Sequence, residues 1–538
     1  MVKTRSKEYN DFKEWKRIHT TINSEEDQLK ACFSQLYNLI RNCKKDAYPN
    51  FLAAFSNREI ETLLIDCMIH DSRYNRGSTY KFKAEKVIEF VANSGYKDEP
   101  DVDKDGNPLL NRTTALLFAF LHYRLKFWKS RLFDIYNNFD VNYIHAKTGV
   151  THFHVACSYG LENIVEKFIE RGQGPNCHVQ GLVFTPLLLA LKWGCEKVIE
   201  KMLNYDPKLV NAQDEEGNPL LYLALGPTRF NRAVIELLLE RGADPNLANA
   251  KGWTPLHLIC ADCWDDDAYV KQFFEIVDSH NQTVEVDAKD KLGRTPLQWA
   301  VARLAPKIID VLLDRGADLS SFVFPTEVYF AKHVDIEYGN LGNPNVAGRQ
   351  WPIKKCEIVP LILGARTMDT VERLEKRGYE LDQGVVLMIM TLFSKRKMFE
   401  EPTNDKKSWY YKKNFVSQAK NIAMKPGLSL YDLIPLQPKE AAKLLAYEDY
   451  LSLDSKKREI IDLPKGSRKE CSVHLCEKLS RGFFRRWALE YYLEMIRYRL
   501  PIECCEMIID ESFTNKNLYH ICLAAKTRAL KIRKYNSR

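Results

Sequence analysis

A short motif present in six copies constrains the fold of this chain more than any other feature of its sequence. Each copy opens with Thr or Pro, continues with mainly apolar residues and, in most copies, closes with Ala. Successive copies lie 34 to 41 residues apart, a period typical of arrays built from one repeated supersecondary unit. The copies occupy residues 114–119, 151–156, 185–190, 219–224, 254–259 and 295–300.

A ten-residue motif follows most copies of the first. Its apolar pairs recur at i, i+1, i+4 and i+5, which places them on one face of a helix and leaves Glu or Asp facing water. Gly172, Gly242 and Gly316 close three of these segments, and Gly readily adopts the left-handed conformation that ends many helices. The clearest copies are residues 163–172, 197–206, 233–242 and 307–316, with divergent ones at 86–95 and 369–378.

The first motif has the signals of a helix start. Thr at its first position can accept a hydrogen bond from an early helical amide, and Pro next suits the first turn, where its missing N–H costs nothing. In two copies Ala115 and His152 stand in place of this Pro. Each unit is thus predicted to be a helix, a tight turn, a second helix and a long turn. One unit cannot bury its apolar face alone, but stacked neighbours can.

These residues resemble the ankyrin repeat family, most strongly between residues 185 and 318. The segments TPLL, GADPN, KGWTPLH, GRTPLQ and GAD occur there in order. The resemblance implies an all-α solenoid of about seven ankyrin-type units, which is a scaffold for binding other proteins. It also implies that His257, in the TPLH segment, braces neighbouring turns by hydrogen bonds. Asn249 stands where Asp is usual, so we expect its turn to be less well fixed.

The chain is predicted to contain four segments. Residues 1–80 have helical apolar stripes and are expected to cap the array, because its end units must hide the last apolar face. Residues 81–320 form the ankyrin array, and residues 321–425 hold a degenerate repeat and a basic linker. Residues 426–538 are dense with helix signals and are predicted to form a helical domain.

This last segment resembles the F-box-like PRANC domain, which follows ankyrin arrays in poxvirus proteins and in some insect proteins, notably of parasitoid wasps. The resemblance rests on SLYDLI, LSRGFFRRWALE and YRLPIECCEMII, in this order after the array. It implies that the F-box-like helices dock on the Skp-type linker subunit of a cullin ubiquitin ligase. The alternative is that these helices only seal the end of the solenoid.

Two sets of residues are the candidate partner contacts. Trp253 is the preferred anchor of the array, because an exposed Trp at a turn tip suits an interface; the other interpretation is that it packs against the next tip. The first set lies at the predicted turn tips: Asp214, Glu215, Glu216, Asn249, Lys251, Trp253, Lys291, Leu292 and Arg294. The second set belongs to the F-box-like segment: Leu500, Pro501, Ile502, Glu503, Met507, Ile508 and Leu518.

The sequence contains no recognisable catalytic motif. It has no P-loop, nucleophile elbow, HExxH pair or kinase motif set, so we expect a protein that is not an enzyme and needs no cofactor. A calcium-like run from Asp101 has Arg112 where the loop needs a bidentate Glu. Two groups with metal-like spacing are interpreted as packing residues, and no metal is expected: His257, Cys260 and Cys263, and Cys471, His474 and Cys476.

Composition and charge place the chain among intracellular soluble proteins. No apolar run approaches the ~18–20 residues of a membrane span, and the charged N-terminus lacks the apolar core of a secretory signal. The 14 cysteines are therefore expected to be reduced, in the cytoplasm or the nucleus. The net charge of +8 is concentrated in residues 394–425 and 526–538, which argues against a surface built to track nucleic acid.

The sequence thus favours a monomeric, non-enzymatic adaptor. Its array would recruit a target protein, and its C-terminal helices would dock the ligase linker. The alternative is a plain ankyrin scaffold or sequestering inhibitor whose C-terminus only caps the solenoid. The identity of the target and the role of the two basic stretches are not encoded in any motif.

Overall fold

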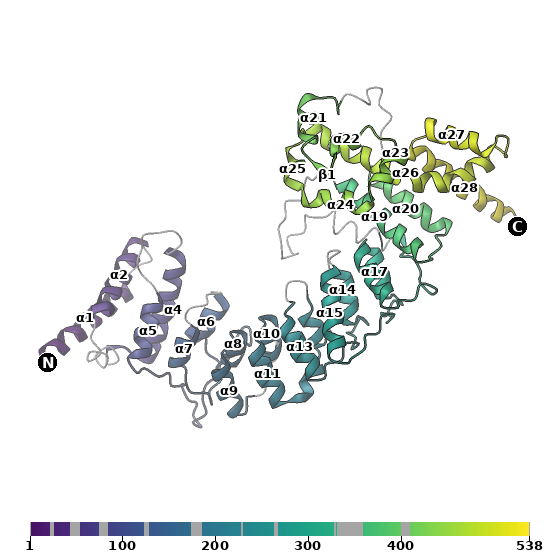
Figure 1. The fold of residues 1–538 in the computed structure, drawn as a ribbon. Helices are drawn as coiled ribbons and strands as arrows, with labels where there is room; N and C mark the ends of the chain where they lie inside the picture. Colours follow the sequence, from purple (N-terminus) through teal and green to yellow (C-terminus); the bar gives the residue numbers. More distant parts are fainter. Residues whose placement is uncertain are drawn as a thin grey trace. The chain divides into compact units, whose positions relative to one another are not determined.

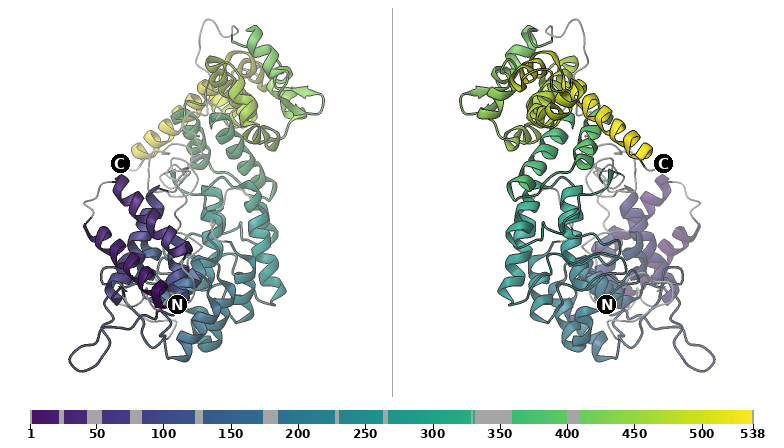
Figure 2. Two further views of the ribbon diagram at one scale, coloured as in Figure 1. Left: turned by 90° about the vertical axis from the view of Figure 1, so that its left-hand side faces the viewer. Right: turned by 90° about the vertical axis from the view of Figure 1, so that its right-hand side faces the viewer.

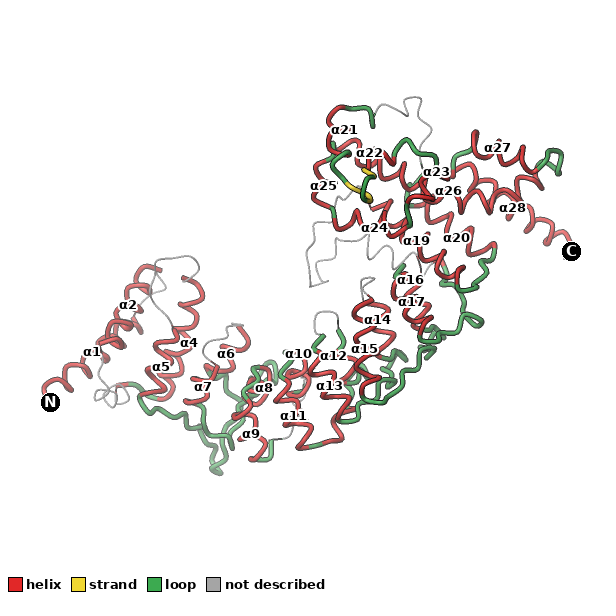
Figure 3. The backbone as a smooth tube through the Cα atoms, in the orientation of Figure 1, coloured by secondary structure: helices red, strands yellow, loops and turns green. Residues whose placement is uncertain are grey.

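The computed structural model describes most of the chain, and the described part is mainly α-helical (Figure 3). The chain divides into two compact units, Met1–Ala250 and Lys251–Arg538. Among the described helices, none combines the length and the apolar character that crossing a bilayer would demand. The described residues are 2–21, 26–42, 54–74, 84–122, 129–173, 185–226, 230–262, 267–327, 330, 359–399 and 409–536.

The first unit begins with helices that precede the repeats. Helix α1 packs on α2, and the indole N–H of Trp15 donates to the carbonyl of Cys32 at 2.8 Å. Helix α5 packs against α2 and α4 and buries Val87 and Val91. The helices expected over residues 1–80 are present, while their capping role stays a prediction. Their bounds are α1 (Val2–Thr21), α2 (Glu26–Asn42), α4 (Asn57–Tyr74) and α5 (Ala84–Asn93).

Pairs of short helices follow in the first unit (Figure 1). The first helices of successive pairs pack on one another, and so do the second helices of the last three pairs. This is the stacked arrangement that the repeat predicts, so the all-α ankyrin fold is confirmed. The pairs are α6 (Ala115–His122) with α7 (Lys129–Ile135), α8 (His152–Ser158) with α9 (Glu162–Glu170), α10 (Pro186–Lys192) with α11 (Glu196–Tyr205), and α12 (Leu220–Ala224) with α13 (Arg232–Glu240); the 3-10 helix η2 (Pro207–Asn211) follows α11.

Helix starts and ends follow the local signals of the motif. The Thr185 hydroxyl accepts a hydrogen bond from the backbone N–H of Leu188 at 3.3 Å, with Pro186 in the first turn of α10. Gly172 and Gly242 follow α9 and α13 with φ of 79° and 87°, the left-handed conformation that favours Gly.

Two copies of the first motif lack Pro at the start of their helix. In both, the backbone N–H that Pro would lack donates a hydrogen bond. Ala115 is the first residue of α6, and its N–H donates to the carboxylate of Glu61 on α4. His152 is the first residue of α8, and its N–H donates to the carbonyl of Tyr143 at 3.2 Å. The His152 ring also hydrogen-bonds the Thr114 hydroxyl at 2.7 Å. Helix α6 is therefore capped by a side chain from outside the repeats.

Glu61 belongs to a partly buried polar cluster that joins α4 to the first repeats. The Tyr136 hydroxyl donates to Glu61 Oε2 at 2.7 Å, and the Arg112 guanidinium lies 3.3 Å from the same atom. Arg112 also pairs with Asp98, whose other oxygen accepts from the Tyr143 hydroxyl at 2.5 Å. Burial raises the pKa of Glu61 to about 7, although Tyr136 and Arg112 act to lower it.

The second unit opens with two further helix pairs. Helix α14 packs on α16 and α15 packs on α17, while α17 packs on the following helix α19. Thr295 caps α16 through the N–H of Gln298 at 3.3 Å, and Gly316 ends α17 with a φ of 91°. The helices are α14 (Pro255–Asp262), α15 (Asp267–Ser279), α16 (Pro296–Ala302), α17 (Pro306–Asp314), α19 (Val359–Lys376), α20 (Gln383–Lys395) and α21 (Lys413–Ala419).

The C-terminal helices are organised around the long helix α26. It packs against α19, α23, α27 and α28, and it buries Cys476 and Phe484 completely. A two-stranded hairpin lies at the margin of these helices, as both views of Figure 2 show. The elements are β1 (Ala423–Lys425), β2 (Leu428–Ser429), α22 (Leu430–Leu433), α23 (Pro438–Leu444), α24 (Tyr447–Ser455), α25 (Lys457–Asp462), α26 (Lys465–Met495), α27 (Ile502–Ser512) and α28 (Asn515–Asn536).

The expected division between residues 425 and 426 does not match this arrangement. It falls inside the hairpin, where Ala423 pairs with Ser429. Helix α19, from the segment expected to be a degenerate repeat and linker, packs on α26, and the Leu361 N–H donates to the Ser472 hydroxyl at 3.2 Å. The degenerate repeat and the C-terminal helices therefore share one core. Of the basic stretches, residues 400–408 and 537–538 lie outside the described residues.

The Glu61 cluster predicts that the first unit loses stability as pH rises. Because the folded-state pKa of Glu61 is about 7, above its ordinary value of 4.5, the folded chain holds this proton more tightly than the unfolded chain. Stability should therefore fall between about pH 5 and pH 7. Thermal unfolding of the intact chain should show this fall in stability with rising pH. The slope of stability against pH should be smaller in Glu61→Gln. An equal slope in both proteins would contradict this assignment.

The cap of α6 gives a second prediction. Ala115→Pro removes the N–H that donates to Glu61, and we expect a loss of about 1–3 kcal/mol because a buried carboxylate loses a donor. The matched control is the reverse exchange Pro186→Ala, at the same position of α10, which should change stability by about 1 kcal/mol or less. Urea unfolding measures both. A loss for Ala115→Pro no larger than that for Pro186→Ala would contradict a stabilising role of the Glu61 bond.

Candidate protein-binding surfaces

Hydrogen bonds within the turn tip before α12 fix its backbone. Only part of this tip is therefore open to a partner. Asp214 Oδ1 accepts from the backbone N–H groups of Glu216 at 2.9 Å and Asn218 at 2.8 Å. The Asn249 amide donates to Asn218 Oδ1 at 2.9 Å, which ties two successive tips together. Asp214 and Asn249 are half-buried, whereas Glu215 and Glu216 are exposed. Of the predicted contact residues at this tip, the two glutamates are the exposed ones.

The tips of the second unit are also joined to each other and fixed by an Asp side chain. Their exposed charged residues are lysines instead of glutamates. The Lys291 N–H donates to the carbonyl of Lys251 at 3.0 Å, so two tips are again joined. Asp290 Oδ1 accepts from the N–H groups of Leu292 and Arg294, both at 2.9 Å. Lys251, Lys291 and Leu292 are exposed, and Leu292 leaves 74% of its surface free. This tip therefore presents one exposed apolar side chain together with two exposed lysines.

Asp290 is the residue that organises this tip, and sequence reasoning did not single it out. Burial acts to raise the pKa of its carboxyl, but hydrogen bonds from Arg294 and Leu292 outweigh burial and lower it. The Arg294 guanidinium lies over the Trp299 ring, 4.5 Å from its centroid. Arg294 is half-buried in these contacts. Its predicted role as a surface contact is therefore secondary to its role in the turn.

Trp253 is not the exposed anchor that the sequence favoured. Its ring is half-buried and meets the Trp299 ring edge to face, with centroids 4.4 Å apart. Trp253 thus packs on helix α16 of the next repeat, whereas the other interpretation expected it to pack against the next tip. The exposed apolar side chain of this tip is Leu292 instead.

The residues with metal-like spacing make structural hydrogen bonds. His257 Nδ1 contacts the Thr254 hydroxyl at 2.9 Å, and His257 Nε2 contacts the Arg294 carbonyl at 3.0 Å. Burial lowers the pKa of His257, which favours its neutral form. His474 Nε2 contacts the Ile434 carbonyl at 3.0 Å. Cys263 lies outside the described residues, and among those described no cluster of three His, Cys, Asp or Glu side chains could hold a metal ion.

The F-box-like residues fall into an exposed group and a buried one. Leu500, Ile502 and Met507 leave 41%, 48% and 61% of their surfaces free, and Pro501 and Glu503 are also exposed. Ile508 is half-buried.

Leu518 is a correction to the predicted contact set. It is completely buried, because α28 packs on α26 and this residue lies on the packed face. It cannot contact a partner while the fold is intact.

Buried polar contacts hold α27 in place. The Arg481 guanidinium on α26 donates to the Ile509 carbonyl at 2.5 Å and to Asn515 Oδ1 at 3.1 Å. Arg485 Nε donates to Asp510 Oδ1 at 2.8 Å. Within α27 only Cys505 and Ile509 are buried. The helix is therefore anchored along one narrow stripe, with most of its apolar side chains on the free side.

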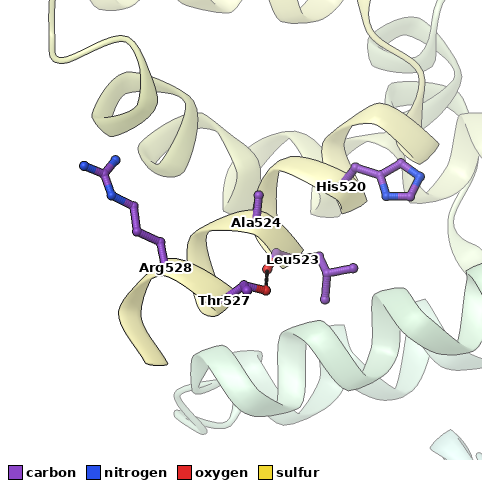
Figure 4. A pocket seen from close by; sticks show the side chains of 5 residues that line it. All are labelled: His520, Leu523, Ala524, Thr527 and Arg528. Carbon is purple, nitrogen blue, oxygen red and sulfur yellow. Dashed lines mark hydrogen bonds between the residues drawn. The ribbon is translucent and has the colours of Figure 1, made fainter. Parts of the chain in front are cut away.

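An open depression of about 430 Å³ lies along α28 (Figure 4). All its lining residues belong to this one helix: His520, Leu523, Ala524, Thr527 and Arg528. The Thr527 hydroxyl donates to the Leu523 carbonyl at 3.0 Å, so it is occupied by its own helix. This is the flank of an exposed helix rather than an enclosed ligand site.

The organising role of Asp290 can be tested directly. Asp290→Ala should cost about 1–3 kcal/mol, because its side chain is fully buried and several donors lose their acceptor. Lys291→Ala, one residue away and exposed, should change stability by about 0.5 kcal/mol or less. Urea unfolding of the intact chain compares the two. Equal effects would show that the tip does not depend on the Asp290 carboxylate.

Known proteins share the repeats over a limited part of this chain. The chain is 24% identical to the human transient receptor potential cation channel subfamily A member 1 over 213 residues, 39% of this chain and 19% of that protein. It is 34% identical to a putative ankyrin repeat protein of fowlpox virus over 73 residues, 14% of this chain and 21% of that protein. A putative E3 ubiquitin-protein ligase of Plasmodium falciparum is 31% identical over 121 residues, 21% of this chain and 1% of that protein.

The chain spans 27% or less of the length of the first curated relatives that it matches. The family model for ankyrin repeats matches residues 153–249 and 228–322. These residues include the helix pairs whose Thr caps, Gly ends and joined tips are described above. Residues 153–322 of this chain are therefore ankyrin repeats.

Proposed function

We propose that this protein is a non-enzymatic adaptor with two binding surfaces. The ankyrin repeats recruit a target protein, and α27 docks on the Skp-type linker subunit of a cullin ubiquitin ligase. The observation that supports the second surface is the outward placement of Leu500, Ile502 and Met507, at the start of and along a helix in which Cys505 and Ile509 are the buried residues. The ligase part of the proposal derives from the resemblance of residues 426–538 to the PRANC domain.

The exposure of α27 favours docking over capping. A helix that only sealed the repeats would bury its larger apolar side chains, because burial stabilises by about 25 cal/mol per Å². Here Ile502 and Met507 are about half exposed or more, while the small Cys505 faces the core. An amphipathic helix with a free apolar face suits insertion into a groove of a partner. The plain scaffold or sequestering inhibitor remains the second candidate function.

The tips of the repeats support recruitment of a protein target. Glu215, Glu216 and Lys291 are exposed on turns whose backbones are fixed by Asp214 and Asp290. Lys251 is exposed on a turn joined to the next one by the Lys291 N–H. Fixed turns lose little conformational entropy on binding, which favours affinity. Leu292 supplies an apolar contact between charged neighbours.

Copurification with the linker subunit bound to a cullin tests the ligase surface. The intact chain should bind, and Leu500→Ala with Pro501→Ala should weaken binding at least about tenfold, since two exposed contacts are removed. The control is Val323→Ala, an apolar residue of the same unit that is 66% exposed outside α27, which should bind like the intact chain. Circular dichroism checks that each variant folds.

The same experiment separates the two functions. No binding of the linker by the intact, folded chain would overturn the ligase role and leave the scaffold. Deletion of residues 471–538 would not separate them, because it removes the helix on which α19 packs. Lys291→Glu with Leu292→Ala should weaken target capture and leave linker binding unchanged, because these residues are not on α27.

A further inference from the structure

One stretch in the C-terminal part of the chain is basic and aromatic and contains no acidic residue. Residues 406–431 include six lysines, and the flanking acidic residues in the sequence are Asp405 and Asp432. Residues 409–431 are described and include α21, which lies at the edge of the C-terminal helices (Figure 1). Neither binding surface proposed above uses them. The second unit therefore has a concentration of positive charge with no assigned role.

The lysines around α21 are not neutralised by carboxylates of the fold. Lys412, Lys413 and Lys420 are exposed, and none of them forms an ion pair with a described residue. Lys425, by contrast, pairs with Asp449 at 2.8 Å. Unpaired surface charge acts over about 8–10 Å at physiological ionic strength. The three exposed lysines thus form a cationic surface that attracts an anionic partner.

An aromatic cluster beside these lysines extends from the core to the surface. Phe415 of α21 is completely buried, and the Trp409 ring lies against it with centroids 5.1 Å apart. The Tyr410 ring has its centroid 5.2 Å from that of Trp409 and 4.4 Å from that of Tyr411. Tyr411 leaves 62% of its surface free. The exposed Tyr411 ring is thus supported by packed rings and directly precedes Lys412.

The spacing along α21 places two of the lysines on one face. Lys413 and Lys420 are seven residues apart and exposed, while Phe415 lies on the buried face. Lys420 also lies over the Tyr431 ring, 5.4 Å from its centroid. Hydrogen bonds at the start of α22 lower the pKa of Asp432, and the nearby Lys420 charge lowers it further. This face therefore combines lysines and aromatic rings, with one ionised carboxylate near Lys420.

We propose that the exposed side of α21 binds the surface of an anionic lipid bilayer. This α21 face consists of Tyr411, Lys412, Lys413 and Lys420. A Tyr ring has an apolar body and a polar tip, which suits the headgroup level of a bilayer. Lysine ammonium groups attract lipid phosphates and the carboxylate of phosphatidylserine. Apolar contact and charge attraction add together at such a surface, so one ring and three lysines act jointly.

A single-stranded nucleic acid is the other polyanion that lysines and aromatic rings bind. Proteins that hold single strands stack successive bases on several aromatic side chains. Within residues 409–431, Tyr411 is the only large aromatic side chain that is exposed, since Trp409, Tyr410 and Tyr431 are half-buried. One stacking surface does not follow a strand, whereas one ring beside lysines is enough for shallow insertion among headgroups. The α21 face therefore suits a bilayer better.

Flotation of the intact chain with vesicles tests the proposal. The chain should float with vesicles of equal parts phosphatidylcholine and phosphatidylserine, but not with phosphatidylcholine alone, and added salt should weaken binding. Lys412→Glu with Lys413→Glu should lower the affinity at least about tenfold, since each lysine contributes to the attraction. The matched control Lys526→Glu with Arg528→Glu makes the same change of charge on exposed residues of α28 and should bind within about threefold of the intact chain.

The aromatic part of the α21 face is tested by Tyr411→Ala, which should lower the affinity about threefold or more, while Tyr411→Phe should bind like the intact chain. Circular dichroism checks that each variant folds. The proposal is overturned if the intact chain does not float with the mixed vesicles, or if the α28 control loses as much affinity as the Lys412 and Lys413 variant. Binding of a polyuridine oligonucleotide without flotation would assign this face to nucleic acid instead.

Discussion

The structure depends on the burial of each helix pair by its neighbour. In the first unit, the ring centroid of Phe168 in α9 lies 5.5 Å from that of Phe153 in α8 and 6.4 Å from that of Phe133 in α7. All three side chains are buried. The contact within a pair thus continues into the pair before it. A single repeat is too small to form a hydrophobic core. It becomes stable because its apolar face packs against the next repeat.

Local signals made the repeats predictable, and contacts distant in sequence were not predictable. Thr185, Pro186 and Gly242 act within one helical turn, so their spacing alone indicates where helices start and end. The cap of Ala115 by Glu61 joins residues 54 positions apart, and no periodicity signals it. The absence of Pro at Ala115 was visible in the sequence, but its reason required the position of α4.

Prediction from sequence has the same limit for single residues of the candidate site. Leu500 and Leu518 are both apolar residues in segments with helical spacing, yet one is 41% exposed and the other is buried. The face that α27 presents depends on contacts with other helices, among them the bond from Arg481 of α26 to the backbone of Ile509. The left-handed turn at Arg497 and Tyr498, between α26 and α27, gave no sequence signal, since such residues rarely adopt this backbone conformation.

Hydrogen–deuterium exchange of the intact chain, with and without the purified linker–cullin complex, is the most direct test of the adaptor account. The account predicts slower exchange of backbone amides in residues 497–512, while the ankyrin repeats at 153–322 exchange as in the free chain. Slower exchange confined to the repeats, or no change anywhere, would contradict the assignment of α27 and its preceding turn as the surface that docks the ligase.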